Sequence, residues 1–424
     1  AVLNADFDWR KYLATLHAEG MNLTRIFTGT YREAAGDFGI ERNTLAPARF
    51  LAPWPEREGR FDLRSWNEAY FDRLKAFVGE AERLGIAVEV TLFCSTYAER
   101  QWSLSPFHPA NNGGLFALAD WRRLYTLDNG GALPFQEQFT RKIVRELNAF
   151  SNVIFEIQNE PWADRTVTGE PVNPYMPLRW PNTADCADAA SLAWQERVAE
   201  WIRSEEAGLE KRHLIAWNAC NFRAPLRSIL KGADIVNFHY AYPEAVWWNY
   251  GWNVPVSYDE TGFLGTGDEA YRRQAWRFLL AGGGLFNHLD YSFSVGKEDG
   301  TDFQAKSPGG GSPALRRQLR FLREFLESLP LVSMRPDRET VRHAPGAEAV
   351  AISAPGRVWA IYLTGGGGSH LVLDVPPGRY QAEWFRPADG ARIGEETLSH
   401  GRERLRLAVP EFAGDAALRL TRTR

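Results

Sequence analysis

Short apolar runs rich in β-branched residues alternate with longer amphipathic stretches through the first three quarters of this 424-residue chain. Strands separated by helices pair in parallel, because each helix returns the chain to the same end of the sheet. We predict seven strands, at Leu23–Phe27, Ala87–Phe93, Val153–Asn159, Leu214–Asn218, Ile235–His239, Val256–Glu260 and Leu285–Tyr291. Helices are predicted at Trp9–Glu19, Trp66–Leu84, Phe135–Phe150, Asp185–Gly208, Asp268–Ala281 and Pro313–Ser328.

The lengths of the connecting segments show which α/β fold this is. Segments that follow strands are long, at 28–65, 94–133, 161–184, 240–253 and 292–312, whereas segments that lead into strands are short. In a (β/α)8 TIM barrel the loops after the strands lie on one face and carry the active site. We therefore predict a barrel over residues 1–330. Since the chain opens on the first helix, we expect its first strand to be missing, truncated or compressed into Ala1–Asn4.

After Pro330 the pattern changes to short alternating runs separated by Gly and Pro. Such runs are typical of an antiparallel β-sandwich. Strands are predicted at Ala349–Ile352, Val358–Leu363, Leu371–Val375, Tyr380–Phe385 and Ala417–Thr421, with a hairpin loop at Gly365–Gly368. We therefore assign residues 331–424 to a small C-terminal β-sandwich domain.

Composition excludes several classes of protein. The 49 basic and 53 acidic residues nearly balance, and no basic stripe could follow a nucleic-acid backbone. No apolar run reaches the roughly 18 residues of a membrane span, so we expect neither a nucleic-acid nor a membrane partner. Three cysteines without a C-x-x-C pair give no disulfide framework and no structural zinc site, and no cofactor is expected.

Two properties stay open in the sequence. The chain does not begin with Met, so we expect it to be processed or truncated. A removed signal segment would make the protein secreted or periplasmic, and otherwise we expect it in the cytoplasm. The oligomeric state is not set by the sequence.

Aromatic residues are frequent, with 16 Trp, 14 Tyr and 25 Phe. The indole has an apolar face and an N–H that needs a partner, which suits it to binding sugars. Several of these Trp residues fall in the long loops, at Trp54, Trp102, Trp162, Trp180, Trp247, Trp248 and Trp252. About half of all the aromatic residues are expected to lie in the core instead.

Two predicted strands end in a glutamate. Glu160 follows the buried run "NVIFEIQN", and Glu260 closes "PVSYDE" before a glycine. At one barrel rim two such carboxylates can face each other, as glycoside hydrolysis requires of its acid and its nucleophile. Asp259 competes with Glu260, but we expect only one of them to face inward, because neighbouring strand residues point to opposite faces. Glu160 could also be an ordinary solvated residue.

The segment "NVIFEIQNEP" resembles the fourth-strand signature of clan A glycoside hydrolases, in particular the cellulase and mannanase family 5. "PVSYDETG" resembles their seventh-strand segment. The resemblance implies a retaining hydrolase with Glu160 as acid/base and Glu260 as nucleophile. It further implies that Arg25 keeps the nucleophile ionised, and that Asn159 binds the sugar 2-hydroxyl. His239 matches the sixth-strand histidine of the clan.

The sequence departs from the family at three places. Ala241 stands where the clan has a tyrosine after that histidine, so either neighbour, Tyr240 or Tyr242, could contact Glu260. The third strand ends in Cys94, where relatives often have histidine. The segment "GLFNHLDYSF" carries no tryptophan, and its Asn287, Asp290 and Tyr291 are either replacements or plain strand-end residues.

Three functions remain in competition. The first is a retaining hydrolase of β-linked sugars, or a transglycosylase using the same covalent intermediate, acting on a polysaccharide, oligosaccharide or glycoside. In this function Arg25, Asn159, Trp162, His239 and Tyr240 bind substrate. The second is a noncatalytic carbohydrate-binding barrel. The third, a metal-dependent enzyme, would need three or more ligands at the rim, and beyond the two glutamates we find no carboxylate cluster and no H-x-H pair.

Overall fold

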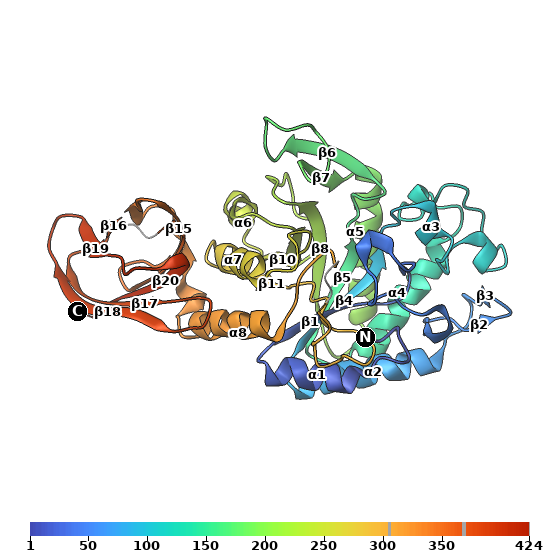
Figure 1. The fold of residues 1–424 in the computed structure, drawn as a ribbon. Helices are drawn as coiled ribbons and strands as arrows, with labels where there is room; N and C mark the ends of the chain where they lie inside the picture. The colour runs from blue at the N-terminus through green and yellow to red at the C-terminus, as the bar shows by residue number, and fades with distance from the viewer. Residues whose placement is uncertain (304–306, 367–369, 424) are drawn as a thin grey trace.

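The computed structural model describes residues 1–303, 307–366 and 370–423. Seven parallel strands form the central sheet in the order in which they occur along the chain. They are β1 (Leu23–Phe27), β4 (Ala87–Cys94), β5 (Val153–Asn159), β8 (Leu214–Asn221), β9 (Ile235–His239), β10 (Val256–Glu260) and β11 (Leu285–Phe286). The sheet curls into an incomplete (β/α)8 barrel, which confirms the predicted fold class (Figure 1).

Helices surround this sheet. They are α1 (Trp9–Ala18), α2 (Glu68–Arg83), α3 (Glu99–Trp102), α4 (Leu133–Leu147), α5 (Ala189–Glu206), α6 (Pro243–Asn249), α7 (Asp268–Leu279) and α8 (Pro313–Glu327). Each long helix buries one apolar face against the strands; on α4 this face includes Phe139, Ile143 and Leu147. The strands are buried on both faces, as parallel strands covered by helices must be.

The barrel is open between its first and last strands. Among the described residues no strand pairs with the outer edge of β1 or of β11. Residues 1–4 do not fill the gap, because Asn4 instead forms an isolated antiparallel bridge with Phe50. The last strand is also shorter than the predicted Leu285–Tyr291. The chain leaves the sheet after Phe286, and Asp290 there pairs with Arg316 of α8 at 2.6 Å.

A second difference lies between β5 and α5. The sequence predicted a loop at 161–184 and a helix from Asp185. The structure instead has a hairpin there, formed by β6 (Thr166–Pro171) and β7 (Thr183–Ala187), which projects from the end of the barrel in Figure 1. Helix α5 therefore begins at Ala189, where the Asp188 side chain caps it by accepting from the Ser191 N–H at 2.9 Å. A smaller hairpin, β2 (Glu56–Arg57) and β3 (Arg60–Phe61), lies in the loop after β1.

The C-terminal part is all β. One sheet has the order β12 (Arg335–Pro336), β14 (Ala347–Ala354), β15 (Val358–Gly366), β20 (Ala413–Arg422), β17 (Gly378–Phe385), β18 (Arg392–His400). The other has the order β13 (Val341–His343), β16 (His370–Leu373), β19 (Leu405–Ala408). All neighbours in both sheets are antiparallel. Gly367 and Gly368 of the predicted hairpin loop lie outside the described residues.

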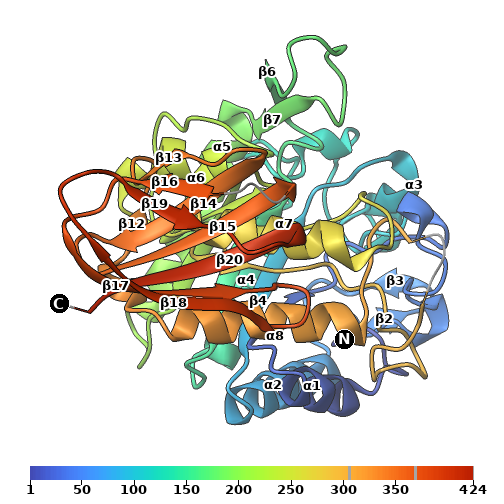
Figure 2. The same ribbon diagram turned by 60° about the vertical axis from the view of Figure 1, so that its left-hand side comes forward.

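Strand β15 shows how the two parts meet. Its alternate residues Trp359, Ile361 and Leu363 face the interior between the two β-sheets, while Val358, Ala360 and Tyr362 join the barrel core. Tyr362 stacks on Trp276 of α7, with ring centroids 5.3 Å apart. The larger sheet thus lies against α7 and α8, as Figure 2 shows.

Candidate active site

Two buried glutamates meet at the ends of β5 and β10. Glu160 comes directly after β5 and is 8% exposed, and Glu260 is the last residue of β10 and is 9% exposed. The chain turns sharply at Glu160, where φ is 45°, and its N–H donates to the Asn218 side chain at 3.1 Å. The two carboxylates have oxygens within 4.8 Å of each other.

Strand β10 presents two adjacent carboxylates to the barrel interior. Asp259 approaches Arg25 at 3.6 Å and His239 at 3.4 Å, while Glu260 contacts Arg25 at 2.7 Å. The expectation that only one of the two faces inward is therefore wrong. The pairing of β10 with β9 shifts register between Tyr258 and Glu260, and a bulge of this kind breaks the strict alternation of a strand.

Arg25 of β1 joins the acidic groups from two strands. Its guanidinium donates twice to Glu156 and once to Glu260, each at 2.7 Å, and also to Asn159 at 2.5 Å. Burial opposes its charge, but Glu156, Asp259 and Glu260 hold its pKa well above the ordinary value. Arg25 is thus a fixed cation below the glutamate pair, and its planar guanidinium fixes the positions of the carboxylates that it binds.

Three donors surround Glu160. Tyr97, in the loop after β4, donates to it at 2.7 Å, and the His239 ring nitrogen Nδ1 lies 2.9 Å away. The Tyr240 hydroxyl lies 3.1 Å from Glu160 and 3.0 Å from Glu260, so it bridges the pair. The sixth-strand tyrosine that contacts Glu260 is therefore Tyr240. Its positive φ of 53° turns the ring into the site.

The surroundings of the pair separate its two pKa values. Burial would raise the pKa of Glu160, but hydrogen bonds from His239, Tyr97 and Tyr240 outweigh burial and lower it. Burial raises the pKa of Glu260 in spite of His239 and Arg25. Because the oxygens are so close, the two groups titrate together, and the ionisation of either one opposes the ionisation of the other.

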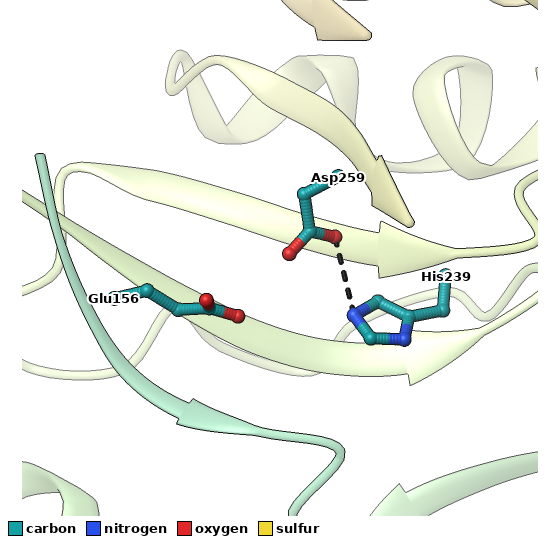
Figure 3. A group of neighbouring side chains, drawn as sticks. All are labelled: Glu156, His239 and Asp259. Carbon is teal, nitrogen blue, oxygen red and sulfur yellow. Dashed lines mark ion pairs between the residues drawn. The ribbon is translucent and has the colours of Figure 1, made fainter. Parts of the chain in front are cut away.

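A second acidic layer lies deeper in the barrel. Glu156 of β5, His239 of β9 and Asp259 of β10 converge on one another in Figure 3, with ligand atoms within 4.8 Å. Burial opposes the charge of His239, but Glu260 and Asp259 raise its pKa well above the ordinary value. His239 and Arg25 in turn lower the pKa of Asp259 to about 2, despite its burial.

This layer, and the trio Glu160, His239 and Glu260, have ligand types that could hold a metal ion. Binding would require the ring of His239 to lose its proton, because a metal ligand must offer a lone pair. Arg25 and protonated His239 already supply two positive charges to these carboxylates. The arrangement therefore fits an ion-paired network better than a metal centre.

A cavity of about 1020 Å³ opens above the glutamate pair and continues between β1 and β11. Exposed aromatic side chains stand at its rim: Phe38 and Phe263 are each 42% exposed. Trp180, from the loop of the β6–β7 hairpin, contacts Phe263 with ring centroids 5.1 Å apart. These flat apolar surfaces, beside a cavity whose wall includes Glu160 and Glu260, are of the kind that sugar rings stack on.

The structure brings together most of the residues singled out in the sequence. Arg25, Asn159, His239, Tyr240 and both glutamates share one cluster. Trp162 is instead buried, and it packs edge-on against the His239 ring at 5.3 Å. Trp54 and Trp102, from the long loops, are also buried.

Several site residues were missed in the sequence. Glu89 and Glu156 gave a signal, because a carboxylate within an apolar strand run needs a buried partner. Glu89 accepts from Asn237 at 2.8 Å, and burial together with Glu156 and Asp259 raises its pKa well above the ordinary value. Tyr97 lies in a loop without periodicity, so no pattern in the sequence points to it.

Comparisons with known proteins bear on the fold. No protein-family model matches the chain, and no curated protein matches its sequence. A candidate glycoside hydrolase from Bacteroides vulgatus ATCC 8482 has a TM-score of 0.66 at 13% identity, covering 100% of this chain and 78% of that one. A family 5 glycoside hydrolase from the same organism has a TM-score of 0.58 at 14% identity. The match covers 98% of this chain and 85% of that one.

A family 30 subfamily 8 xylanase from Clostridium acetobutylicum is also similar. It has a TM-score of 0.51 at 9% identity, and the match covers 99% of this chain and 93% of that one. Identities at this level establish likeness of fold, and function must be argued from the site. The chain therefore has the fold of the clan A glycoside hydrolases, in a divergent form with an incomplete barrel.

Proposed function

We propose that this protein is a retaining glycoside hydrolase that cleaves β-linked sugars, with Glu160 as acid/base and Glu260 as nucleophile. The supporting observation is the buried glutamate pair on the loop face, with oxygens within 4.8 Å. Retaining enzymes hold their two carboxyl groups about 5–5.5 Å apart, whereas inverting enzymes separate them by about 6.5–9.5 Å to admit a water molecule.

In the proposed first step a Glu260 oxygen forms a bond to the anomeric carbon while the bond to the leaving oxygen breaks. Glu160 gives its proton to that oxygen. In the second step water attacks the same carbon, Glu160 takes a proton from the water, and Glu260 leaves as a carboxylate. A sugar acceptor in place of water would give transglycosylation. Arg25, 2.7 Å from Glu260, stabilises the carboxylate form that starts and ends this cycle.

The surroundings raise the pKa of Glu260 and lower that of Glu160, whereas the first step needs the proton on Glu160. We propose that Tyr240 carries the transfer. Its hydroxyl lies within 3.1 Å of both carboxylates, so it can accept a proton from Glu260 while it donates its own to Glu160. Arg25 then holds the ionised Glu260, and binding of the leaving oxygen at Glu160 favours the protonated acid.

The remaining predicted residues have supporting roles in this proposal. The Asn159 amide is held by Arg25 at 2.5 Å and by Tyr97 at 2.9 Å, which suits it to receiving a sugar hydroxyl above the nucleophile. His239 supports Glu160, and the buried Trp162 fixes the ring plane of His239. Trp162 thus contributes to binding only through His239.

We further propose that residues 1–330 form the catalytic unit and that residues 331–424 have a structural role. The packing of Tyr362 on Trp276 supports this role. So does the ion pair between Arg272 of α7 and Asp415 of β20 at 2.9 Å, which is buried between the two parts.

Replacing the nucleophile tests the function. Glu260→Ala should lower kcat for aryl β-glycosides by about 10⁴-fold or more, because no covalent intermediate can form. Added azide should restore turnover and give a glycosyl azide of inverted anomeric configuration. In Glu160→Ala, azide should instead attack the intermediate and give the retained configuration. Activity of Glu260→Ala within tenfold of the parent, or the opposite azide stereochemistry, would overturn the assignment. Glu411→Ala, on the exposed surface, is the matched control.

A further inference from the structure

Glu33 is a carboxylate of the cavity wall that takes no part in the proposed mechanism. It lies in the loop after β1 and lines the same cavity as Glu260. Among the residues that the structure describes, none donates a hydrogen bond to Glu33 and none forms an ion pair with it. A partly buried carboxylate without a partner is costly, so its presence at a binding site calls for an explanation.

Four arginines on the cavity wall or in contact with the loop of Glu33 have other partners among the described residues. Arg25 binds Glu156, Glu260 and Asn159. Arg42 pairs with Asp302 at 2.7 Å, and Arg100 pairs with Asp37 at 2.5 Å. The neighbouring Arg32 lies over the ring of Phe50 at 4.5 Å. Asp37 in the same loop is thus neutralised, whereas Glu33 has no ion pair with any of the described residues.

The loop holds Glu33 in a defined place. On one side, the hydroxyls of Thr28 and Thr30 donate to the Leu92 carbonyl of β4 at 2.7 and 3.2 Å. On the other side, the Asp37 carboxylate accepts from the Ala34 N–H at 2.7 Å. The chain is thus held on both sides of Glu33, and a side chain carried on a fixed backbone is better placed to accept hydrogen bonds from a ligand.

Glu33 lines the same cavity as the nucleophile Glu260 and the acid Glu160. Burial is the main cause that raises its pKa to about 7, and the nearest charges that add to this are Glu260 and Asp37. In the proposed reaction the ring that carries the anomeric carbon lies over Glu260, while the leaving group lies at Glu160. We place Glu33 beside the sugar ring that becomes attached to the enzyme, because it shares the cavity wall with Glu260 and the charge of Glu260 acts on it.

We propose that Glu33 determines specificity by accepting hydrogen bonds from adjacent hydroxyl groups of that sugar. A carboxylate can accept from two neighbouring hydroxyls at once, and hydrogen bonds to a charged acceptor are the stronger kind. In this proposal the sugar hydroxyls supply the hydrogen-bond donors that Glu33 lacks among the described residues. This inference rests on the proposed function for the placement of the sugar.

The first test compares Glu33→Gln with the parent on a panel of nitrophenyl β-glycosides. On the best substrate the variant should lose about 10- to 100-fold in kcat/KM, the amount that hydrogen bonds to a charged group contribute. Glu41→Gln, an exposed residue of the same loop, is the matched control. A loss of less than about twofold on every glycoside would overturn the proposal.

Monodeoxy versions of that substrate show whether the loss comes from a contact. Removing the contacted hydroxyl should cost the parent about 10- to 100-fold but cost Glu33→Gln less than about threefold, since the two changes remove the same interaction. Equal losses in both enzymes for every deoxy sugar would contradict the contact. If Glu33→Gln does not fold, Glu33→Asp, which keeps the charge and shortens the reach, should lose the same hydroxyl preference.

Calorimetric binding of the free monosaccharides separates this inference from the proposed function. If the parent cleaves no glycoside but binds a sugar at least tenfold more tightly than Glu33→Gln does, the hydrolase proposal fails and the role of Glu33 stands. If both proteins bind the sugar equally, or neither binds any sugar in the panel, the role of Glu33 is overturned.

Discussion

The two flanks of the candidate active site are built in opposite ways. On the flank of β5, β9 and β10 the ionisable groups contact one another; Glu160, His239 and Glu260 each have protein partners within 3.1 Å. On the flank between β11 and β1 the sheet is open, the cavity continues between the strands, and Glu33 has no partner among the described residues. The paired flank fixes the charges that the chemistry needs, and the open flank leaves groups available to a ligand.

The largest expected difference is in the stability lost on removing an arginine, either Arg25 from the paired cluster or Arg42 from the open flank. Arg25→Ala would leave Glu156, Asp259 and Glu260 buried without their shared cation, so the free energy of unfolding should fall by about 3–5 kcal/mol. Arg42→Ala on the open flank breaks an ion pair in which the arginine is 61% exposed, and it should cost less than about 1 kcal/mol. Urea unfolding measures both. Equal losses would remove the distinction between the flanks.

The pH dependence of the free energy of unfolding should reveal that Glu33 has no partner among the described residues. The folded pKa of Glu33, about 7, lies above its ordinary value of 4.5, so its stabilising contribution is present below pH 4.5 and is lost as the pH rises through 7. Relative to the parent, Glu33→Gln should therefore gain about 2 kcal/mol in unfolding free energy between pH 5 and pH 7. A difference that stays constant over this range would show that Glu33 is paired or well solvated.

On the paired flank the pH dependence of the unfolding free energy should have the opposite sign and a smaller size. The folded pKa of Asp259, about 2, lies below its ordinary value of 3.8, so its contribution is present above that value and is lost as the pH falls. The stability deficit of Asp259→Asn relative to the parent should narrow by about 1 kcal/mol between pH 5 and pH 3. The measurement is again urea unfolding. A deficit that widens on acidification would contradict the ion-paired network.

The sequence predicted the strands around the paired cluster better than the last strand, which borders the open flank. The predicted bounds of β1, β5, β9 and β10 match the structure. In β5, β9 and β10 the reason is that the strands are buried on both faces and are therefore mostly apolar. The cluster around Arg25 followed from residues at the ends of those strands. The predicted Leu285–Tyr291 strand on the open flank was too long, since polar contacts to α8 end it.

Other errors have tertiary causes. The inward turn of both Asp259 and Glu260 depends on a bulge in the pairing of β10 with β9, which the sequence of one strand does not encode. The hairpin β6–β7 and the polar strand β18 carry too few apolar residues for a clear period of two. Glu33 and Tyr97 lie in loops, where positions are set by contacts and not by periodicity.

The stacking of Tyr362 on Trp276 bears on how this protein could be re-engineered. Three side chains of β15, Val358, Ala360 and Tyr362, belong to the same apolar core as the barrel. A chain cut after α8 would leave Trp276 and Phe325 facing water, and a bare β-domain would expose Tyr362. The C-terminal strands are thus no interchangeable module, and a graft onto another barrel would have to carry α7 and α8 with it.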